Sequence, residues 1–477
     1  MPSNAVGHRH ALCPLHPKGP PLRQPPSSSS LDPKQLIEQL KSSLSVALLQ
    51  FYQLAGRLVT EEDRDADGEV KSTSVYIDCD GQGAEFVHAA ADGIKVADVL
   101  ALSGDLPSFL YDFFQLDGAV NHDGHFSPLL SVQLTELVDG VFLGCSFNHV
   151  VGDGTAYWKF FNTWAEIARA ADRGGGGGGL SRPPVHDRWF LDGYGAPPLK
   201  LPFTDPSRLL LRFAPPPLRE RMFHFSREAV ARLKARANEE CGRGDLSSFQ
   251  SLSALLWRAV TRARGLAPGQ ATSCRVAIEN RARLRPPLAK EYFGNSIYAV
   301  AASATAGELL AQGIGWAAAL LNRAVAEHTD AEIRAQLGAW MARPFVYTLR
   351  EFDENSVMVG SSPRFDMYGC EFGWGRAVAA RSGGANKFDG KISMYPGWEG
   401  GGAWTRSCAW SRRTWRRSRG TRSSWAPCHR PWRWRCCSRG LINGRCMLTR
   451  LIELGISNAG STATTSVFCN IKISREL

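Results

Sequence analysis

An apolar strand followed directly by an aromatic-rich helix constrains the fold of this chain more than any other feature. Residues 140–147 (G-V-F-L-G-C-S-F) have the composition of a strand that is buried on both faces. After a short turn, one face of the next helix carries six large or apolar side chains, which are Tyr157, Phe160, Phe161, Trp164, Ile167 and Ala168. A strand and a helix of this kind both need partner layers, so we expect a layered α/β fold.

Further helices and strands are interspersed along the chain without a strict strand–helix–strand rhythm. Apolar spacing predicts helices at 31–58, 226–238, 247–264 and 306–337, and strands at 74–78, 130–134 and 275–279. This mixture favours mixed sheets covered by helices. Six consecutive glycines at 174–179 predict a flexible connector between two blocks of chain.

The composition is that of an ordinary globular protein. A length of 477 residues suggests two or three domains at about 150 residues each. The sequence has no run of 18 apolar residues and no apolar stretch near its start, so we expect neither a membrane-spanning helix nor a secretory signal. The cysteines before residue 400 are scattered and suggest no metal site, which is typical of a reduced, cytoplasmic protein.

The net charge of +11 comes from one segment of the chain. Residues 403–440 contain 11 arginines, no lysine and no acid, so the remainder holds 45 basic and 45 acidic residues and is neutral. Such a segment is either an RNA- or membrane-binding tail or the product of a shifted reading frame. A shift turns residues 403–428 into V-D-A-E-L-R-L-V-P-E-N-M-A-A-L-E-G-D-E-E-F-M-G-A-V, which predicts a strand and then a helix. We favour the shifted frame after Gly402.

The turn between the apolar strand and the aromatic helix contains a histidine and an aspartate four residues apart, His149 and Asp153. This spacing alone is weak, because His88 and Asp92 repeat it. Only His149 stands at the end of a buried strand beside a helix start, where catalytic groups collect, so we interpret His88 as part of a surface turn. The alternatives are a hydrogen-bonded core histidine and a helix N-cap at Asp153.

These residues belong to a set of motifs by which the chain resembles the plant BAHD acyltransferases, which use acyl-coenzyme A. The resemblance covers residues 27–402, and four ordered motifs are far more specific than one. The motifs are H-V-V-G-D-G at 149–154, S-S-F-Q at 247–250, N-R-A-R at 280–283 with Y-F-G-N at 292–295, and F-G-W-G at 372–375. Segments 361–365 and 386–390 further resemble a group described as hydroxycinnamoyltransferase-like or as uncharacterised acetyltransferases.

The resemblance implies transfer of an acyl group from acyl-CoA to a hydroxyl or amine of a small metabolite, without an acyl-enzyme. His149 would be the general base. Asp153 would pair with an arginine, here Arg281, to hold the turn, and Gly154 would let the backbone bend. Acyl-CoA would be a co-substrate, with no permanently bound cofactor and no metal. The enzyme would be a monomer of plant secondary metabolism that transfers groups other than aminoacyl groups.

Two further motifs have expected roles away from the reacting atoms. By resemblance, Ser248 and Ser251 are candidates for lining the CoA channel, although a serine at a helix start also serves as a cap. The F-G-W-G motif is structural in the family, and its residues here are Phe372, Gly373, Trp374 and Gly375. Glu371 stands where the family has aspartate.

The fold implied by the resemblance is a pair of chloramphenicol-acetyltransferase-like α/β domains with mixed sheets and a central CoA channel. The expected segments are an atypical N-terminus without stable order (1–26), a first domain (27–173), a Gly/Pro-rich crossover (174–220), an incomplete second domain (221–402) and a tail of low order (403–477).

Other functions remain open from the sequence alone. The chain as written could be a catalytically inactive, truncated relative, or a nucleic-acid or membrane binder through its Trp/Arg tail. Peptide-bond condensation shares the His-and-Asp-Gly signature, but the F-G-W-G motif argues against it. We expect acyl-CoA and a small-molecule acceptor as partners, and neither nucleic acid nor a membrane.

Overall fold

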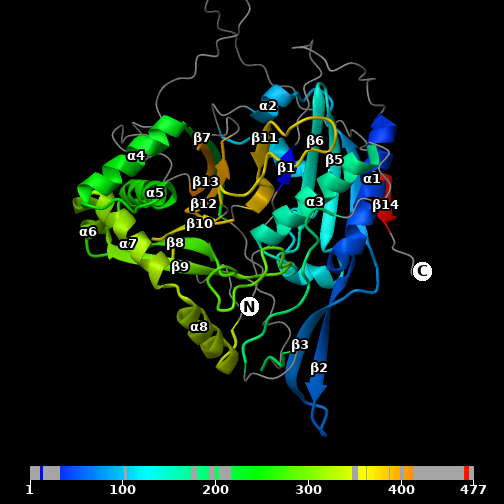
Figure 1. Cartoon of the computed structure of the whole chain (residues 1–477), viewed down its shortest axis with the longest axis horizontal. Coiled ribbons are helices and arrows are strands. Elements are labelled where there is room, and N and C mark those ends of the chain that lie inside the picture. The colour runs from blue at the N-terminus through cyan, green and yellow to red at the C-terminus, as the bar shows by residue number, and fades with distance from the viewer. Residues whose placement is uncertain are drawn as a thin grey trace, which may run out of the picture.

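The computed structural model describes residues 11–13, 33–100, 105–172, 180–192, 199–202, 216–345, 353–360, 362–385, 387–397, 402–411 and 467–471. Within these ranges the chain forms two halves, each a β-sheet with helices, which lie side by side in Figure 1. The predicted α/β fold with mixed sheets is confirmed. The glycine run at 174–179 lies outside the described residues.

The N-terminal half is built on a four-stranded sheet of order β14-β4-β5-β6, in which β4 and β5 are parallel and the other pairs antiparallel. Its strands are β4 (Ala84–Ala90), β5 (Leu130–Leu137), β6 (Gly140–Phe147) and β14 (Val467–Ile471). Helices α1 (Pro33–Gln50) and α3 (Gly154–Asp172) share one apolar core with the sheet. A hairpin of β2 (Arg57–Arg64) and β3 (Val70–Asp78) projects from this half (Figure 1).

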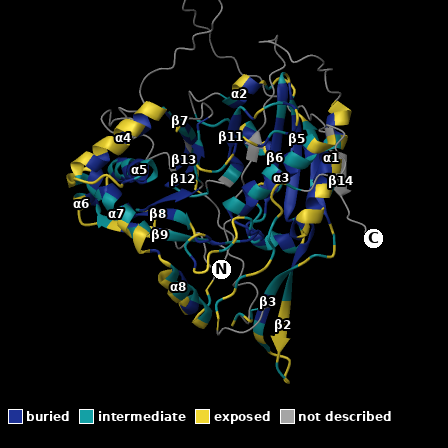
Figure 2. Cartoon of the chain, in the orientation of Figure 1, coloured by how far each residue is buried: buried dark blue, intermediate teal, exposed yellow. Residues whose placement is uncertain are grey.

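Short helices connect these elements. They are η1 (Tyr52–Ala55), α2 (Val96–Leu100), η2 (Ser108–Phe113) and η3 (Asn121–His125). Figure 2 shows the buried residues along the strands and the inner sides of the helices, whereas the tip of the β2–β3 hairpin is exposed. The core of this half is rich in aromatic rings, and Phe51 makes edge-on contacts with both Phe160 and Phe293.

The C-terminal half is built on a six-stranded sheet of order β7-β13-β12-β10-β8-β9. β10 runs parallel to β8 and β12, and the other pairs are antiparallel. The strands are β7 (Leu218–Phe225), β8 (Ala271–Glu279), β9 (Ile297–Thr305), β10 (Val357–Gly360), β12 (Lys391–Pro396) and β13 (Trp404–Ser411). The helices are α4 (Arg227–Glu240), α5 (Ser248–Arg264), α6 (Ala306–Ala311), α7 (Ile314–Glu327) and α8 (Asp330–Ala342).

The long helix predicted at 306–337 is divided into α6, α7 and α8. Gly313 is the N-cap of α7, and the Thr329 hydroxyl accepts a hydrogen bond from the backbone N–H of Glu332 at the start of α8. Both residues adopt extended backbone angles, which interrupt a helix. Helical spacing alone did not reveal these two breaks.

The two halves meet across one face of the six-stranded sheet. Val359 and Ile392 point from this sheet into a core shared with α4, α5 and α7. On the opposite face, Met222 and Tyr395 belong to the core of the N-terminal half. Residues of the segment 367–380 join that same core although they lie within the second block of the sequence. The interface between the halves is therefore partly a continuous core.

Three strands fall in segments that the sequence analysis expected to lack stable order. β1 (Ala11–Cys13) pairs with β11 (Ala379–Arg381), β14 pairs with β4, and β13 lies between β7 and β12. The structure nevertheless pairs these residues in sheets, because strands pair through backbone N–H and C=O groups, which any non-proline residue supplies. In β13 the small side chains of Cys408 and Ala409 are also fully buried.

Candidate active site

The turn that carries His149 is fixed from both sides by amide side chains. At the end of β6, the Asn148 Oδ1 accepts a hydrogen bond from the N–H of Val150 (3.1 Å), and its Nδ2 donates to the carbonyl of Asn121 (2.8 Å). From the C-terminal half, Asn295 Nδ2 donates to the carbonyls of His149 (2.7 Å) and Val150 (3.1 Å). The backbone on either side of the imidazole is therefore held by both halves of the molecule.

The imidazole of His149 lies in a buried environment, with the residue 5% exposed. Burial lowers the pKa of His149, and the charge of Lys391 acts in the same direction. The nearby Asp153 opposes this change by favouring the protonated ring, so the net direction is downward. The ring is consequently mostly neutral near pH 7 and able to accept a proton.

Asp153 forms a buried, two-pronged ion pair with Arg281. The distances are 2.8 Å from Asp153 Oδ2 to Arg281 Nη1 and 3.0 Å from Oδ1 to Nη2. The two residues are only 1% and 2% exposed. The same carboxylate accepts hydrogen bonds from the N–H groups of Ser296 (2.8 Å) and Ala156 (3.0 Å). Through these hydrogen bonds, the Asp153 carboxylate connects the turn after β6 and the start of α3 to the segment after β8.

Arg281 reaches further along the second block. It donates to the carbonyls of Gly294 (2.9 Å) and Tyr292 (3.2 Å) and pairs with Glu279 (3.1 Å). Its guanidinium also lies over the Tyr292 ring, 5.4 Å from the ring centre. The structure thus brings Asp153 and Arg281 together, as the family resemblance implied.

Gly154 is required by space at the start of α3. A Cβ added there would lie 2.9 Å from the ring of Phe365, so a larger residue would force that ring to move. Two residues earlier, a Cβ on Gly152 would lie 2.6 Å from the Cβ of Ala156. The glycines of the motif therefore permit close approach of neighbouring side chains.

His88 has a different setting from His149. It lies within strand β4, so the interpretation as a surface turn is wrong for this residue. Its Nε2 is 2.7 Å from Oε1 of Glu136 on the adjacent strand, and its side chain is 33% exposed. The strand-forming residues Phe86 and Val87 beside it are a local signal from which this strand could have been predicted.

The serine motif forms the start of α5. Ser247 is the N-cap, because its hydroxyl accepts from the N–H of Gln250 while the Gln250 side chain accepts from the N–H of Ser247. Ser251 is completely buried, and its hydroxyl donates to the carbonyl of Ser247 (3.0 Å). Ser248 is partly exposed. Of the two predicted channel residues, only Ser248 has surface with which to contact a ligand.

The F-G-W-G motif packs into the core of the N-terminal half. The ring of Phe372 contacts Trp164 (4.8 Å between ring centres) and Phe161 (5.5 Å), and Trp374 lies against Phe372 (5.4 Å). Gly373 and Gly375 both have left-handed backbone angles, with φ of 104° and 107°. These are the contacts and angles of a packing motif.

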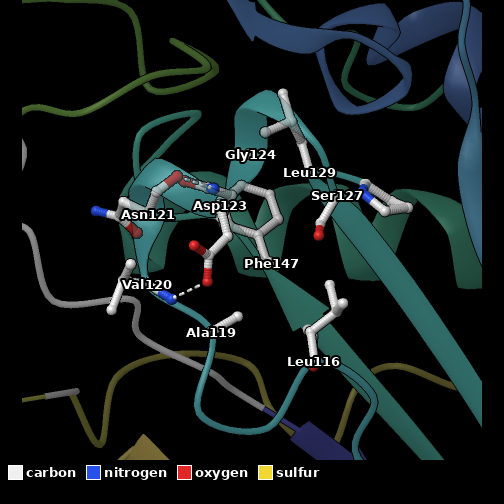
Figure 3. Close-up of a pocket in the computed structure, with 12 residues that line it drawn as sticks. Leu116, Ala119, Val120, Asn121, Asp123, Gly124, Ser127, Leu129 and Phe147 are labelled. Atoms are coloured by element: carbon white, nitrogen blue, oxygen red, sulfur yellow. Dashed lines mark hydrogen bonds between the residues drawn. The ribbon is translucent and has the colours of Figure 1, made fainter. Parts of the chain in front are cut away.

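Two cavities end beside the His149 turn, although His149 itself lines neither. The larger, with a volume of about 500 Å³, has Val150, Val151 and Asn295 in its wall. The smaller, about 30 Å³, reaches Asn148 and has room for one or two water molecules. Figure 3 shows the smaller cavity, with Asp123 accepting a hydrogen bond from the N–H of Val120 (3.0 Å).

Sequence reasoning missed the roles of Asn295 and Ser296, and it did not single out Lys391. Asn295 was part of a recognised motif, so its position was marked but its function was not. No local signal marked Lys391, because a lysine at the start of a strand is ordinarily exposed. Among the residues that the structure describes, no helix is long and apolar enough to cross a membrane, and no cluster of possible metal ligands occurs.

Comparison with known proteins shows which family the chain belongs to. The model of the Transferase family matches residues 25–412. The chain is 38% identical to "Uncharacterized acetyltransferase At3g50280" of Arabidopsis thaliana over 78% of this chain and 83% of that protein. It is 36% identical to "BAHD acyltransferase DCR" of the same species, over 77% of this chain and 75% of that protein.

A solved structure shares the fold. It is that of F. graminearum TRI101 complexed with coenzyme A and T-2 mycotoxin, with a TM-score of 0.67, 15% identity, and coverage of 88% of this chain and 95% of that one. At this identity the likeness concerns the fold alone. The two Arabidopsis relatives and the family match carry the assignment: the chain belongs to the Transferase family of BAHD acyltransferases.

Proposed function

We propose that the chain transfers an acyl group from acyl-CoA to a hydroxyl or amine of a small metabolite, with His149 as the general base. The observation that carries this proposal is the buried imidazole at the end of β6, on a turn held by the Asp153–Arg281 pair and by Asn295. Burial lowers the pKa of His149, which keeps the ring in the form that accepts a proton.

The proposed reaction needs no covalent enzyme intermediate. The imidazole takes the proton from the acceptor as its oxygen or nitrogen attacks the thioester carbonyl. The tetrahedral intermediate then collapses, the carbon–sulfur bond breaks, and the imidazolium returns the proton to the thiolate of CoA. The acyl group ends on the acceptor, free CoA leaves, and the imidazole is neutral again.

In this proposal Asp153 positions the catalytic turn and takes no part in the chemical step. Its carboxylate is almost fully buried and faces Arg281 and two backbone N–H groups, so it holds the turn without contacting substrate. Because Arg281 belongs to the second block of chain, the pair also keeps the two halves in the relation that the site requires.

In this proposal the acceptor reaches the turn through the larger cavity. The larger cavity is of a size that suits a small acceptor, and its wall includes the two residues that follow His149. Ser248 is the remaining serine candidate for contact with CoA. Acyl-CoA is a co-substrate, and we propose that the enzyme acts as a monomer in the cytoplasm. Six cysteines of the described ranges are free, which suits a reducing compartment; they are Cys79, Cys145, Cys241, Cys274, Cys370 and Cys408.

Mass spectrometry of reaction products tests the proposal directly. The protein is incubated with a panel of acyl-CoAs and of acceptors that carry a hydroxyl or an amine. The proposal predicts an acylated acceptor together with one equivalent of free CoA. Free CoA without any acylated acceptor would show hydrolysis in place of transfer, and intact substrates across the panel would contradict the proposed activity.

A further inference from the structure

Lys391, the first residue of β12, is a buried cation between the two halves of the molecule. It is 1% exposed, and among the residues that the structure describes its Nζ finds no hydrogen-bond partner. An ammonium group that is withdrawn from water without a partner is costly, because burial disfavours the charged form. Burial accordingly lowers the pKa of Lys391 to about 8, which still leaves the side chain mostly charged at pH 7.

Strand register determines the direction in which Lys391 projects. Val359 and Ile392 point into the core beneath the helices of the C-terminal half. Since side chains alternate along a strand, Gly360 and Lys391 lie on the opposite face. Tyr395 shares that face, and it is part of the core of the N-terminal half. Lys391 therefore lies on the side of the sheet that faces the catalytic turn.

Three features around Lys391 favour the binding of an anion. Its charge is close enough to lower the pKa of His149. Room for the ammonium depends on Gly360, where an added Cβ would lie 2.4 Å from Lys391 Nζ. Arg275 lies on the same face, in register with Met358, which is itself in register with Lys391. Two basic residues thus stand two strands apart, about 10 Å between backbones.

The acids nearest to Lys391 in strand position are engaged with other groups. Two of them lie on the same face of the sheet, and a third precedes Lys391 by two residues. Glu220 accepts a hydrogen bond from Ser407, Glu279 pairs with Arg281, and Asp389 pairs with Arg264. Within the described part of the chain, these acids therefore give Lys391 no ion-pair partner, which favours a bound ligand as the source of one.

We infer that Lys391 binds a carboxylate carried by one of the two substrates, beside the His149 base. This inference rests on the proposed acyl transfer and names a substrate class for it. The carboxylate would accept the hydrogen bond that Nζ does not otherwise make and would neutralise its charge. Its source is either a dicarboxylic acyl group on CoA or a carboxylic acid acceptor. Lys391 thereby selects the acid over its neutral analogue.

Matched pairs of acid and neutral substrates test this inference. The donor arm compares succinyl-CoA with butyryl-CoA, and the acceptor arm compares an amino acid and an aromatic hydroxy acid with their methyl esters. The ratio of kcat/KM for acid to neutral substrate is measured by release of free thiol. In one arm we expect wild type to prefer the acid, and Lys391→Met to lower the ratio at least tenfold.

Two further variants distinguish an effect of the Lys391 ammonium from a general effect on the fold. Gly360→Ala keeps the lysine but displaces its Nζ, so the ratio should fall in the same direction. Lys387→Met removes a lysine of the same segment that donates to the carbonyl of Ala119, and it should leave the ratio at the wild-type value. A ratio that is equal in wild type and Lys391→Met in both arms overturns the inference.

A melting experiment distinguishes failure of this inference from failure of the proposed function. Each acid of the two arms is added in turn, and at least one should raise the melting temperature of wild type more than that of Lys391→Met. That difference without any thiol release supports the carboxylate site and contradicts acyl transfer. Thiol release with no preference for acids in wild type or variant supports acyl transfer and contradicts the carboxylate site.

Discussion

Replacement of Lys391 by methionine should stabilise the unliganded protein, which is the reverse of what most substitutions of buried residues do. The pKa of Lys391 falls from 10.5 to about 8 through burial alone. At about 1.4 kcal/mol per pKa unit, the folded state carries a penalty of about 3 kcal/mol at neutral pH. Methionine has a similar length and no charge, so it removes this penalty without leaving a large cavity.

The stability that Lys391→Met gains over wild type should decrease as pH rises. Below pH 8 the lysine is protonated in both the folded and the unfolded protein, so the full penalty is present. Between pH 8 and 10.5 the folded protein loses its proton first, and the penalty shrinks as pH rises. The difference in unfolding free energy between Lys391→Met and wild type should therefore be about 3 kcal/mol at pH 7 and close to zero above pH 10.5.

Urea unfolding of both proteins at pH 7, 9 and 10.5 measures this difference. Lys41→Met is a suitable control, because Lys41 is 22% exposed and pairs with Glu38 on the surface of α1, where a change of less than about 1 kcal/mol is expected. A Lys391→Met protein that is less stable than wild type at pH 7, or whose gain does not shrink with pH, would refute the reasoning.

Three other predictions concern the catalytic turn and the end of the chain. Burial lowers the pKa of His149, so kcat/KM should begin to fall only at a pH below 6.5. Lys391→Met removes a charge that lowers this pKa, so the fall in kcat/KM should move to higher pH. A pH-rate profile of both proteins measures the shift. Asp153→Asn should cost about 3 kcal/mol of stability and reduce activity, because it leaves Arg281 buried without its main counter-charge; urea unfolding with Asp330→Asn as a surface-pair control measures the loss. Sequencing the transcript through the codon for Gly402 should show that one shifted frame encodes the acidic strand-and-helix sequence, whereas an unshifted transcript would establish the arginine-rich segment as genuine.

Local patterns in the sequence predicted the parts of the site that are contiguous in the chain. The apolar run of β6 and the aromatic face of α3 position the turn, so His149 and Asp153 could be singled out from their own neighbourhood. The partner of Asp153 could not be found this way, because Arg281 lies 128 residues away. Its assignment came from family resemblance, and the structure brings the two side chains together.

Other features depended on contacts that local sequence does not encode. The face on which Lys391 lies follows from the register of β12 on β10, which distant segments determine together. The burial of Ser251 follows from the packing of α5, so its predicted contact with CoA could not be judged from the motif. The strand β13 was missed because its pairing uses backbone groups, while its side chains gave no alternating apolar signal.

The turnover number of His149→Ala, measured with an acyl-CoA and an acceptor accepted by wild type, tests the central claim most directly. His88→Ala is the matched control, since His88 has the same sequence spacing to an aspartate but pairs with Glu136 on the sheet. Loss of a general base should lower kcat by about 10²- to 10⁴-fold in His149→Ala and leave it near the wild-type value in His88→Ala. Undiminished turnover in His149→Ala would contradict the account.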